Sequence, residues 1–325
     1  MENLTFKEAT LQDYDAVMAI NDNIYGGLDY LPDYYKLFMT MPSMTAFLAE
    51  KKGETVAFCI AQILDNETTL VLRAARVKEV YQGKGILKEL TAHLKRKMKQ
   101  MYPTIQRRCI VTLQTVGDEK PFPTGYVQIC KKRMLSFYQQ ASIIEKKLME
   151  MGESAGGIDV HQLGSEELQQ LLGSKWALNL FPKEKVIINW VPYSIIPSNG
   201  PIIATESDAF LTHEENKDKA EQSPDVFSAV NFIFCKKIGL RLSLDLYGIR
   251  QSNMAVVKEH IVHHARNAVF KAKEAGCEGI HVELYVEVDA PLEELLGITS
   301  SLELKSSDFF VMNKEKYVYL LEAVL

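Results

Sequence analysis

The pattern of apolar and polar residues predicts a strand, a glycine-rich loop and a helix in one continuous stretch, residues 68–101. Over residues 69–77 two sets of side chains alternate without a breaker, which predicts a strand. Over residues 86–98 an apolar residue recurs at every fourth position, which predicts a helix. The loop between them carries Gly83 and Gly85, so the chain can turn tightly where the helix begins.

The elements around this stretch predict a sheet with flanking helices in the first half of the chain. A loop interrupts them at residues 25–32, where a glycine pair, a proline and two tyrosines replace the periodic pattern. Loops with exposed aromatic groups often line binding sites. The predicted strands are residues 4–10, 45–50, 55–64, 107–113 and 134–144, and the predicted helices are residues 11–25 and 125–132.

The second half of the chain repeats this arrangement after a linker. Residues 151–157 are small and flexible, so we expect a boundary there between a domain of residues 1–150 and a domain of residues 158–325. The repeat predicts a degenerate second copy of the same fold. Its loop at residues 247–251 lacks paired glycines, so we expect no cofactor there. The predicted strands of this copy are residues 240–246, 280–288 and 316–324, and its helices are residues 254–272 and 292–296.

Composition and charge place the chain among soluble globular proteins. Its 325 residues are enough for two domains that each bury a core, and 47% of them are hydrophobic. The net charge of −5, from 37 basic and 42 acidic residues, argues against a nucleic-acid partner, which requires a basic excess. No apolar run has the length of a membrane span, and the first ten residues contain no apolar signal core. We therefore expect a cytoplasmic protein without a membrane partner.

The cysteines and histidines show no disulfide or metal-binding pattern. Five cysteines are scattered without C-x-x-C spacing, and Cys59 and Cys109 lie in strand-like apolar runs, which fits buried reduced thiols. A catalytic cysteine is possible but has no local support. His260 and His264 stand one helical turn apart, as two metal ligands would, but without a third ligand a solvated helix face is the better interpretation. We therefore expect no metal.

The glycine-rich loop has the features of a phosphate-binding site. Without Cβ atoms at Gly83 and Gly85 the backbone can approach a diphosphate closely. The free N–H groups of the first helical turn and the positive end of the helix dipole would face that anion. Glycines also occur in any tight turn, so a plain strand-to-helix connection is the alternative. The strand before the loop and the amphipathic helix after it favour the phosphate site.

Strand, loop and helix together resemble the acetyl-CoA pyrophosphate loop of the GCN5-related N-acetyltransferases (GNAT), whose pattern is Q/R-x-x-G-x-G/A. Gln82 and Gly85 match this pattern, and Leu87 stands where a small residue is usual. The order of elements in the first half is also that of the acetyltransferase domain. The resemblance implies an α+β fold with a mixed central sheet flanked by helices, in tandem, the second copy being degenerate. It also implies acetyl-CoA as co-substrate, bound by Val77, Gln82, Gly83, Lys84, Gly85, Ile86 and Leu87.

Three segments resemble one vertebrate family, the histidine N-acetyltransferases. They are residues 24–32, the strand end Arg76-Val77 with the loop Gly83-Lys84-Gly85, and the C-terminal pair of residues 190–193 and 319–323. The resemblance implies acetyl transfer to the α-amine of a small free amino acid, histidine in the named members, and we expect direct transfer in a ternary complex. The family usually has a glutamate where this chain has Arg73. Because arginine pairs readily with carboxylates, this departure indicates an acceptor with an extra acid group or a weakened catalyst.

Acetyl transfer requires an oxyanion partner, a proton for the leaving thiolate and contacts for the acceptor. Backbone N–H groups near Val77 are the expected oxyanion partners. Tyr126 is the candidate for the general acid that protonates the thiolate. Alternatively, Tyr126 is a half-buried tyrosine with a structural role. Tyr138 is the second candidate for the acid. No general base is evident, and Glu50, Glu67 or a water relay are all open. We expect Tyr25 and Tyr30 to form the walls of the acceptor site and Arg73 to contact the acceptor. Asp29 either pairs with the ammonium group of the acceptor or only forms a turn.

Two other functions are compatible with the sequence. Arg73 and Leu87 depart from the family pattern, which would suit a non-catalytic acyl-CoA-binding module. A protein or peptide N-acetyltransferase would need an open acceptor groove, whereas the second domain and the aromatic loop favour an enclosed one. The oligomeric state is not set by the sequence.

Overall fold

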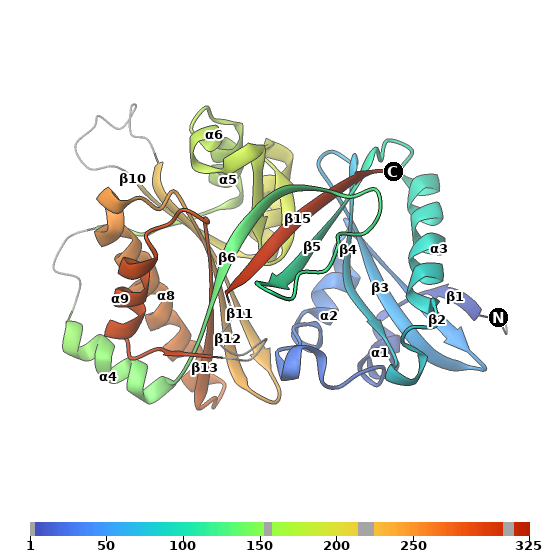
Figure 1. Cartoon of the computed structure of the whole chain (residues 1–325), viewed down its shortest axis with the longest axis horizontal. Coiled ribbons are helices and arrows are strands. Elements are labelled where there is room, and N and C mark those ends of the chain that lie inside the picture. Colours follow the sequence, from blue (N-terminus) through green and yellow to red (C-terminus); the bar gives the residue numbers. More distant parts are fainter. Residues whose placement is uncertain (1–3, 153–157, 214–223, 308–314) are drawn as a thin grey trace. The chain divides into compact units, whose positions relative to one another are not determined.

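The computed structural model describes residues 4–152, 158–213, 224–307 and 315–325. The chain forms two compact units, each with a sheet and flanking helices (Figure 1). The first unit comprises residues 1–110, 122–127 and 321–325, and the second unit comprises residues 111–121 and 128–320.

The boundary between these units differs from the domain boundary expected from the sequence. β6 (Val127–Gln140) pairs antiparallel with β13 (Gly279–Val286), so most of β6 belongs to the sheet of the second unit. α4 (Ala141–Met151) then packs against α8 (Met254–Glu274) in the same unit. The residues that precede the expected linker therefore fold with residues that follow it. The division into residues 1–150 and 158–325 stays a prediction about the extent of the two copies of the fold.

The first unit is built on a sheet in which β1, β2, β3, β4 and β5 are successive neighbours. β1 to β4 are antiparallel, and β5 runs parallel to β4. α3 packs on one face of this sheet, and α1 and α2 lie against the other (Figure 1). The elements are β1 (Leu4–Glu8), β2 (Met44–Lys51), β3 (Glu54–Leu64), β4 (Thr69–Val77), β5 (Arg107–Thr115), α1 (Tyr14–Met18), α2 (Leu31–Thr40) and α3 (Ile86–Met101).

Several of these elements confirm the local predictions. The buried side chains of α3 are Ile86, Leu90, Leu94 and Met98, the same residues that gave the helical period. The turn between β2 and β3 holds Lys52 and Gly53 at φ angles of +53° and +80°, the left-handed pair that two-residue hairpin turns favour. The strand, the hairpin and the long helix of the first unit were thus predictable from neighbouring residues.

The helix predicted for residues 11–25 is wrong beyond Met18, where α1 ends. The amide side chain of Asn21 competes for the backbone there, because its Oδ1 accepts the Asn23 N–H at 2.9 Å. The chain then forms a separate short 3₁₀ segment, Ile24–Gly27, with left-handed φ angles at Tyr25 and Gly26.

The helix predicted for residues 125–132 is also wrong, because β6 begins at Val127. A short apolar run does not distinguish a helix from a strand, and pairing with distant strands decides the outcome. The predicted strand 134–144 is correct as far as Gln140, after which α4 begins at Ala141.

The second unit is built on a sheet in which β6, β13, β12, β11, β10 and β7 are successive neighbours. β12 and β13 are parallel, and the other pairs are antiparallel. α8 covers one face, packing its apolar stripe on the alternating leucines of β12. The further elements are β7 (His161–Leu163), β8 (Lys185–Ile188), β9 (Val191–Ser194), β10 (Asp208–His213), β11 (Pro224–Cys235), β12 (Gly239–Tyr247), β14 (Lys305–Ser306), β15 (Lys316–Val324), α5 (Ser165–Gly173), α6 (Ala177–Leu180), α7 (Gly200–Glu206) and α9 (Leu292–Ser301).

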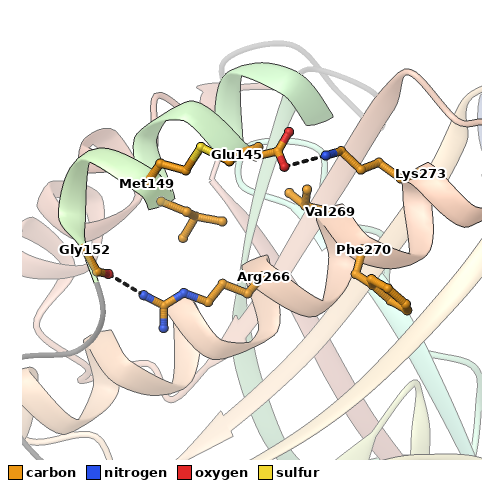
Figure 2. Close-up of a pocket in the computed structure, with 8 residues that line it drawn as sticks. Glu145, Met149, Gly152, Arg266, Val269, Phe270 and Lys273 are labelled. Carbon is orange, nitrogen blue, oxygen red and sulfur yellow. Dashed lines mark hydrogen bonds and ion pairs between the residues drawn. The ribbon is translucent and has the colours of Figure 1, made fainter.

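An open groove of about 470 Å³ lies between α4 and α8 on the surface of the second unit (Figure 2). Leu148 and Val269 are buried beneath it, whereas Met149 and Phe270 are 72% and 62% exposed. Two polar contacts join the helices at its ends, the Glu145–Lys273 ion pair and a hydrogen bond of 2.8 Å from Arg266 to the Gly152 carbonyl (Figure 2). The groove therefore follows from the way these two helices pack.

Candidate active site

β4 carries a bulge where it passes β3. The register shifts between Phe58 and Ile60, so that two β4 residues, Ala74 and Ala75, lie opposite a single residue of β3. Ala74 has a φ angle of +51°, a left-handed conformation that side chains disfavour. A bulge of this kind turns backbone N–H groups out of the ladder. It lies just before Val77, where the oxyanion partners are expected.

β4 and β5 pair only over a short distance in the described register. The parallel pairs run from Thr69 with Arg107 to Val71 with Cys109. Beyond Val71, the described residues of β4 pair with β3. One edge of β4 is thus left for an extended ligand, which can pair with an exposed strand backbone.

The loop between β4 and α3 forms an open cradle. Gly83 and Gly85 have φ angles of +72° and +79°, which glycine adopts without strain. A Cβ atom built on either glycine would meet no other atom within 4 Å, so the space over the loop is empty of protein. Gly85 is the N-cap residue of α3, and no side chain caps the helix.

The amides at the start of α3 face this cradle. The first helical hydrogen bond runs from the Glu89 N–H to the Gly85 carbonyl at 3.1 Å, so the amides of residues 86–88 have no acceptor within the helix. The side chains of the loop bond to backbone: Gln82 Nε2 donates to the Val77 carbonyl at 3.3 Å, and Lys84 Nζ to the Val80 carbonyl at 2.7 Å. Ile86 is buried in the core and anchors the turn. Free amides, the helix dipole and empty space fit the diphosphate of a coenzyme A thioester.

Two arginines of β4 lie on the side of the sheet that carries α2. Arg76 makes a bidentate ion pair with Asp29, with both N–O distances at 3.0 Å. Arg73 donates to Gln62 Oε1 at 2.8 Å, and its guanidinium lies 4.7 Å from the centre of the Phe38 ring. The structure therefore places Asp29, Arg73 and Arg76 near Tyr30, whose pKa all three affect. Asp29 was predicted to pair with the ammonium group of the acceptor. In the structure its carboxylate forms an ion pair with Arg76.

The two predicted wall residues differ in exposure. Tyr25 is 49% exposed and has a φ angle of +51°. Tyr30 is partly buried, with its ring centre 6.2 Å from that of Phe38. Burial raises the pKa of Tyr30 and outweighs the opposite effect of Arg73 and Arg76. The Tyr30 hydroxyl therefore keeps its proton at neutral pH and can donate it in a hydrogen bond.

Tyr126 lies in the first unit, in the segment just before β6 and not in a helix. The Arg108 guanidinium of β5 lies 4.8 Å from the centre of its ring. Burial raises the pKa of Tyr126, and the charge of Arg108 acts in the opposite direction. A protonated phenol near a cation has the chemistry of a general acid. Its role stays a prediction.

Cysteine and metal chemistry have little support in the described residues. Cys59 and Cys109 are buried free thiols, as the sequence predicts. Burial raises the pKa of Cys59 to about 12, so this thiol, opposite the β4 bulge, is not a nucleophile at neutral pH. Among the described residues no group of three or more His, Cys, Asp and Glu side chains is placed to hold a metal ion. None of the helices described combines the length and apolar composition that a membrane crossing requires.

The interpretation of His260 and His264 as part of a solvated helix face is wrong, because both side chains are fully buried. Ser228 Oγ lies between them, 2.7 Å from His260 Nδ1 and 2.8 Å from His264 Nε2. The ring of Phe210 packs on His264 with centres 4.8 Å apart. The pair is thus a polar cluster inside the core.

In the second copy of the fold the two parallel strands stay paired where β4 and β5 of the first copy do not. β12 and β13 pair continuously from Leu240 with Ile280 to Asp245 with Tyr285, so the strands do not separate over this stretch. In the loop before α8, Glu287 Oε2 accepts the Gly248 N–H at 3.1 Å. The Gly248 amide in this loop is therefore already bonded to a carboxylate of the same chain.

The β8–β9 hairpin covers the polar face of this second sheet. The backbone N–H of Asn189, at its turn, donates to Asp245 Oδ2 at 2.8 Å. Tyr247 Oη contacts Ile187, accepting its N–H at 2.7 Å and donating to its carbonyl at 2.9 Å. Lys132 completes the cluster with an ion pair of 2.9 Å to Asp245. In the degenerate second copy, residues of the chain itself thus occupy the polar face of the sheet next to Asp245 and Tyr247.

Some residues of the candidate site were not found from the sequence. Gln62 and Phe38 were missed as partners of Arg73, and Arg76 was noted only as part of a matching segment. A signal was present: two arginines within an otherwise apolar strand need partners if the strand is buried. The positions of those partners, in β3 and α2, depend on the tertiary fold.

Comparisons with known proteins agree with this geometry. The model of the acetyltransferase (GNAT) family matches residues 14–117, and the model of the histidine N-acetyltransferase C-terminal region matches residues 159–277. A tandem GNAT protein from the clavulanic acid biosynthesis pathway superposes with a TM-score of 0.57 at 10% identity, covering 99% of this chain and 98% of that chain. That likeness shows the fold alone. Fold and family matches define the class: the chain is an N-acetyltransferase with a tandem GNAT fold.

Within this class the chain is similar to the histidine N-acetyltransferases, which confirms the resemblance seen in the sequence. The enzyme of Oreochromis niloticus is 26% identical, covering 93% of this chain and 90% of that protein. The enzyme of Scomber australasicus is 25% identical over the same shares of both chains.

Proposed function

We propose that the chain transfers an acetyl group from acetyl-CoA to the α-amine of a small free amino acid, histidine first, in a ternary complex. The observation that carries this proposal is the open glycine cradle at the end of the bulged β4. The cradle suits a diphosphate, and the bulge lies between Arg73, which contacts Gln62, and Arg76, which contacts Asp29. Histidine is proposed as the acceptor because the similar proteins are named histidine N-acetyltransferases.

The residues of the first unit would divide the work as follows. Acetyl-CoA supplies the acetyl group as a thioester. The amides of residues 83–88 hold its diphosphate, and the amides at the bulge stabilise the oxyanion on the thioester carbonyl. The neutral acceptor nitrogen would bond to the carbonyl carbon as the carbon–sulfur bond breaks, and Tyr126 would give its proton to the leaving thiolate. The proton lost by the nitrogen would pass through water to the Tyr126 phenolate, which restores the phenol. Direct transfer to the amine is consistent with Cys59, since burial raises the pKa of its thiol to about 12 and so removes it as an acyl carrier.

Arg73 favours a second acceptor class, amino acids with an extra acid group. The Arg73 guanidinium lies over Phe38, near Tyr30 and beside the bulge, and a guanidinium is a natural partner for a carboxylate. In histidine the same arginine would meet the α-carboxylate. Both acceptors are small and carry a free α-amine.

Release of coenzyme A from acetyl-CoA, measured with a thiol reagent over a panel of free amino acids and peptides, tests the function. We expect release with histidine or with an acidic amino acid, and none with the Nα-acetylated form of the same amino acid. Absence of release with every amino acid would overturn the proposal. Faster release with peptides would replace it with a protein N-acetyltransferase.

Replacing Tyr126 with phenylalanine is expected to lower kcat by about 100-fold, the typical contribution of a general acid, with the KM for acetyl-CoA unchanged. The ring and its contact with Arg108 remain, so a structural role alone would leave kcat near the original value. Initial rates over a range of acetyl-CoA concentrations decide between the two. A loss in Tyr138→Phe and not in Tyr126→Phe would give the acid role to Tyr138.

A further inference from the structure

The aromatic loop of the first unit is fastened to β4 by one buried ion pair. Arg76 Nη1 donates to Asp29 Oδ2 and Nη2 donates to Asp29 Oδ1, and the two side chains are only 2% and 13% exposed. Asp29 Oδ1 also accepts the Leu31 N–H at 3.1 Å, which fixes the start of α2. Planar, two-bond pairing of this kind holds both orientation and distance.

The ion pair lies directly beside Tyr30 and the β4 bulge. Tyr30 follows Asp29 in the chain, its ring packs on Phe38, and Phe38 lies under the Arg73 guanidinium. The backbone N–H of Ala74, at the bulge, is close enough to the Tyr30 hydroxyl to lower its pKa slightly. Tyr30 is therefore placed between the loop and the strand that would carry the thioester.

The loop needs such a fastening because its backbone is strained. Tyr25 and Gly26 are consecutive left-handed residues, with φ angles of +51° and +66°. A residue with a side chain persists in this conformation when surrounding contacts determine it. The Asp29–Arg76 ion pair joins this loop to the sheet.

We propose that Asp29 and Arg76 are positioning residues of the acceptor site, which hold Tyr30 against the bulge so that its hydroxyl can bond the acceptor. The inference rests on the proposed function. It replaces the predicted role of Asp29 as partner of the acceptor ammonium group. The ion pair acts on the acceptor through Tyr30, whereas the diphosphate cradle at residues 83–88 is held independently by α3.

The test is a double-variant cycle with Asp29→Asn and Tyr30→Phe. Each single variant is expected to lower kcat/KM for the acceptor by about 10- to 100-fold, as misplaced substrate contacts do. The dissociation constant for acetyl-CoA should not change. Because Asp29 acts through Tyr30, the double variant should lose no more than the more damaged single variant. Additive losses would overturn the proposal.

A second measurement separates failure of this inference from failure of the proposed function. Hydrogen exchange of peptides covering residues 24–30 and 72–77 needs no turnover, and it should accelerate in Asp29→Asn while exchange of the cradle peptide stays unchanged. Arg76→Lys, which keeps the charge but not the two-bond geometry, should give the same change if Asp29→Asn does not fold. Asp15→Asn, an exposed aspartate of α1, is the matched control and should alter neither exchange nor kinetics. Unchanged exchange in both Asp29 and Arg76 variants would overturn the positioning role.

Discussion

Replacing Gly85 with valine is expected to lower kcat/KM for acetyl-CoA by about 100-fold. Gly85 has a φ angle of +79°, and a branched side chain there costs about 1–2 kcal/mol. The new side chain would also enter the open space over the loop that a diphosphate needs. A hydrogen bond to a charged group contributes about 1.5–3 kcal/mol, and each 1.4 kcal/mol is about tenfold, so the loss of one or two amide contacts accounts for the effect. Initial rates of coenzyme A release and calorimetric titration of acetyl-CoA measure it.

Gly276→Val is the matched control for this prediction. Gly276 follows α8, has a φ angle of +65°, and a Cβ atom there would also meet nothing within 4 Å. It should lose a similar amount of stability, but affinity for acetyl-CoA should be unchanged. Equal losses of affinity in the two variants, or none in Gly85→Val, would contradict a diphosphate site in the cradle.

The cradle and its flanking elements could be predicted from the sequence because their signals are local. β4 and α3 begin and end close to the predicted positions, and the apolar stripe of α3 is the one that its period gave. Gly83 and Gly85 are required by their own φ angles, which the sequence pattern already indicates.

The partners of the charged site residues could not be predicted, because they lie far apart in the chain. Asp29 and Arg76 are separated by 47 positions, and Arg73 meets Gln62 of the neighbouring strand and Phe38 of α2. From sequence, a lone aspartate in an aromatic loop equally suits an ammonium group, a turn or an arginine. The register of β3 against β4 decides among these, and the bulge that sets this register is itself a tertiary feature.

The buried histidines show a signal that the sequence did contain. Val257, His260, His264 and Ala268 follow one another at intervals of three and four, and all four are buried on α8. Two histidines on the apolar stripe of an amphipathic helix are better interpreted as core residues than as a solvated pair. Their burial has an energetic consequence, because a buried histidine resists protonation.

Lowering the pH from about 7.5 to about 5.5 is expected to destabilise the second unit by about 4 kcal/mol. Burial lowers the pKa of His260 to about 3 and that of His281 to about 4, and it lowers the pKa of His264 well below its ordinary value. Below about pH 6.5 the unfolded chain binds protons at these three sites that the folded unit does not bind, so stability falls with pH until the folded-state pKa values are reached. One unit below pH 6.5, each histidine contributes a loss of about 1.4 kcal/mol.

Urea unfolding at the two pH values, followed by tryptophan fluorescence, measures this loss of stability in the second unit. Both tryptophans, Trp176 and Trp190, belong to the second unit, as do the three histidines. His281→Gln should reduce the pH-dependent loss by about one third, since one of three proton-binding differences is removed. His213→Gln, at an exposed position of β10, should leave it unchanged. Equal stability of the original chain at both pH values would mean that water reaches these side chains in the folded protein. The core of the second copy around Ser228 would then be open to solvent.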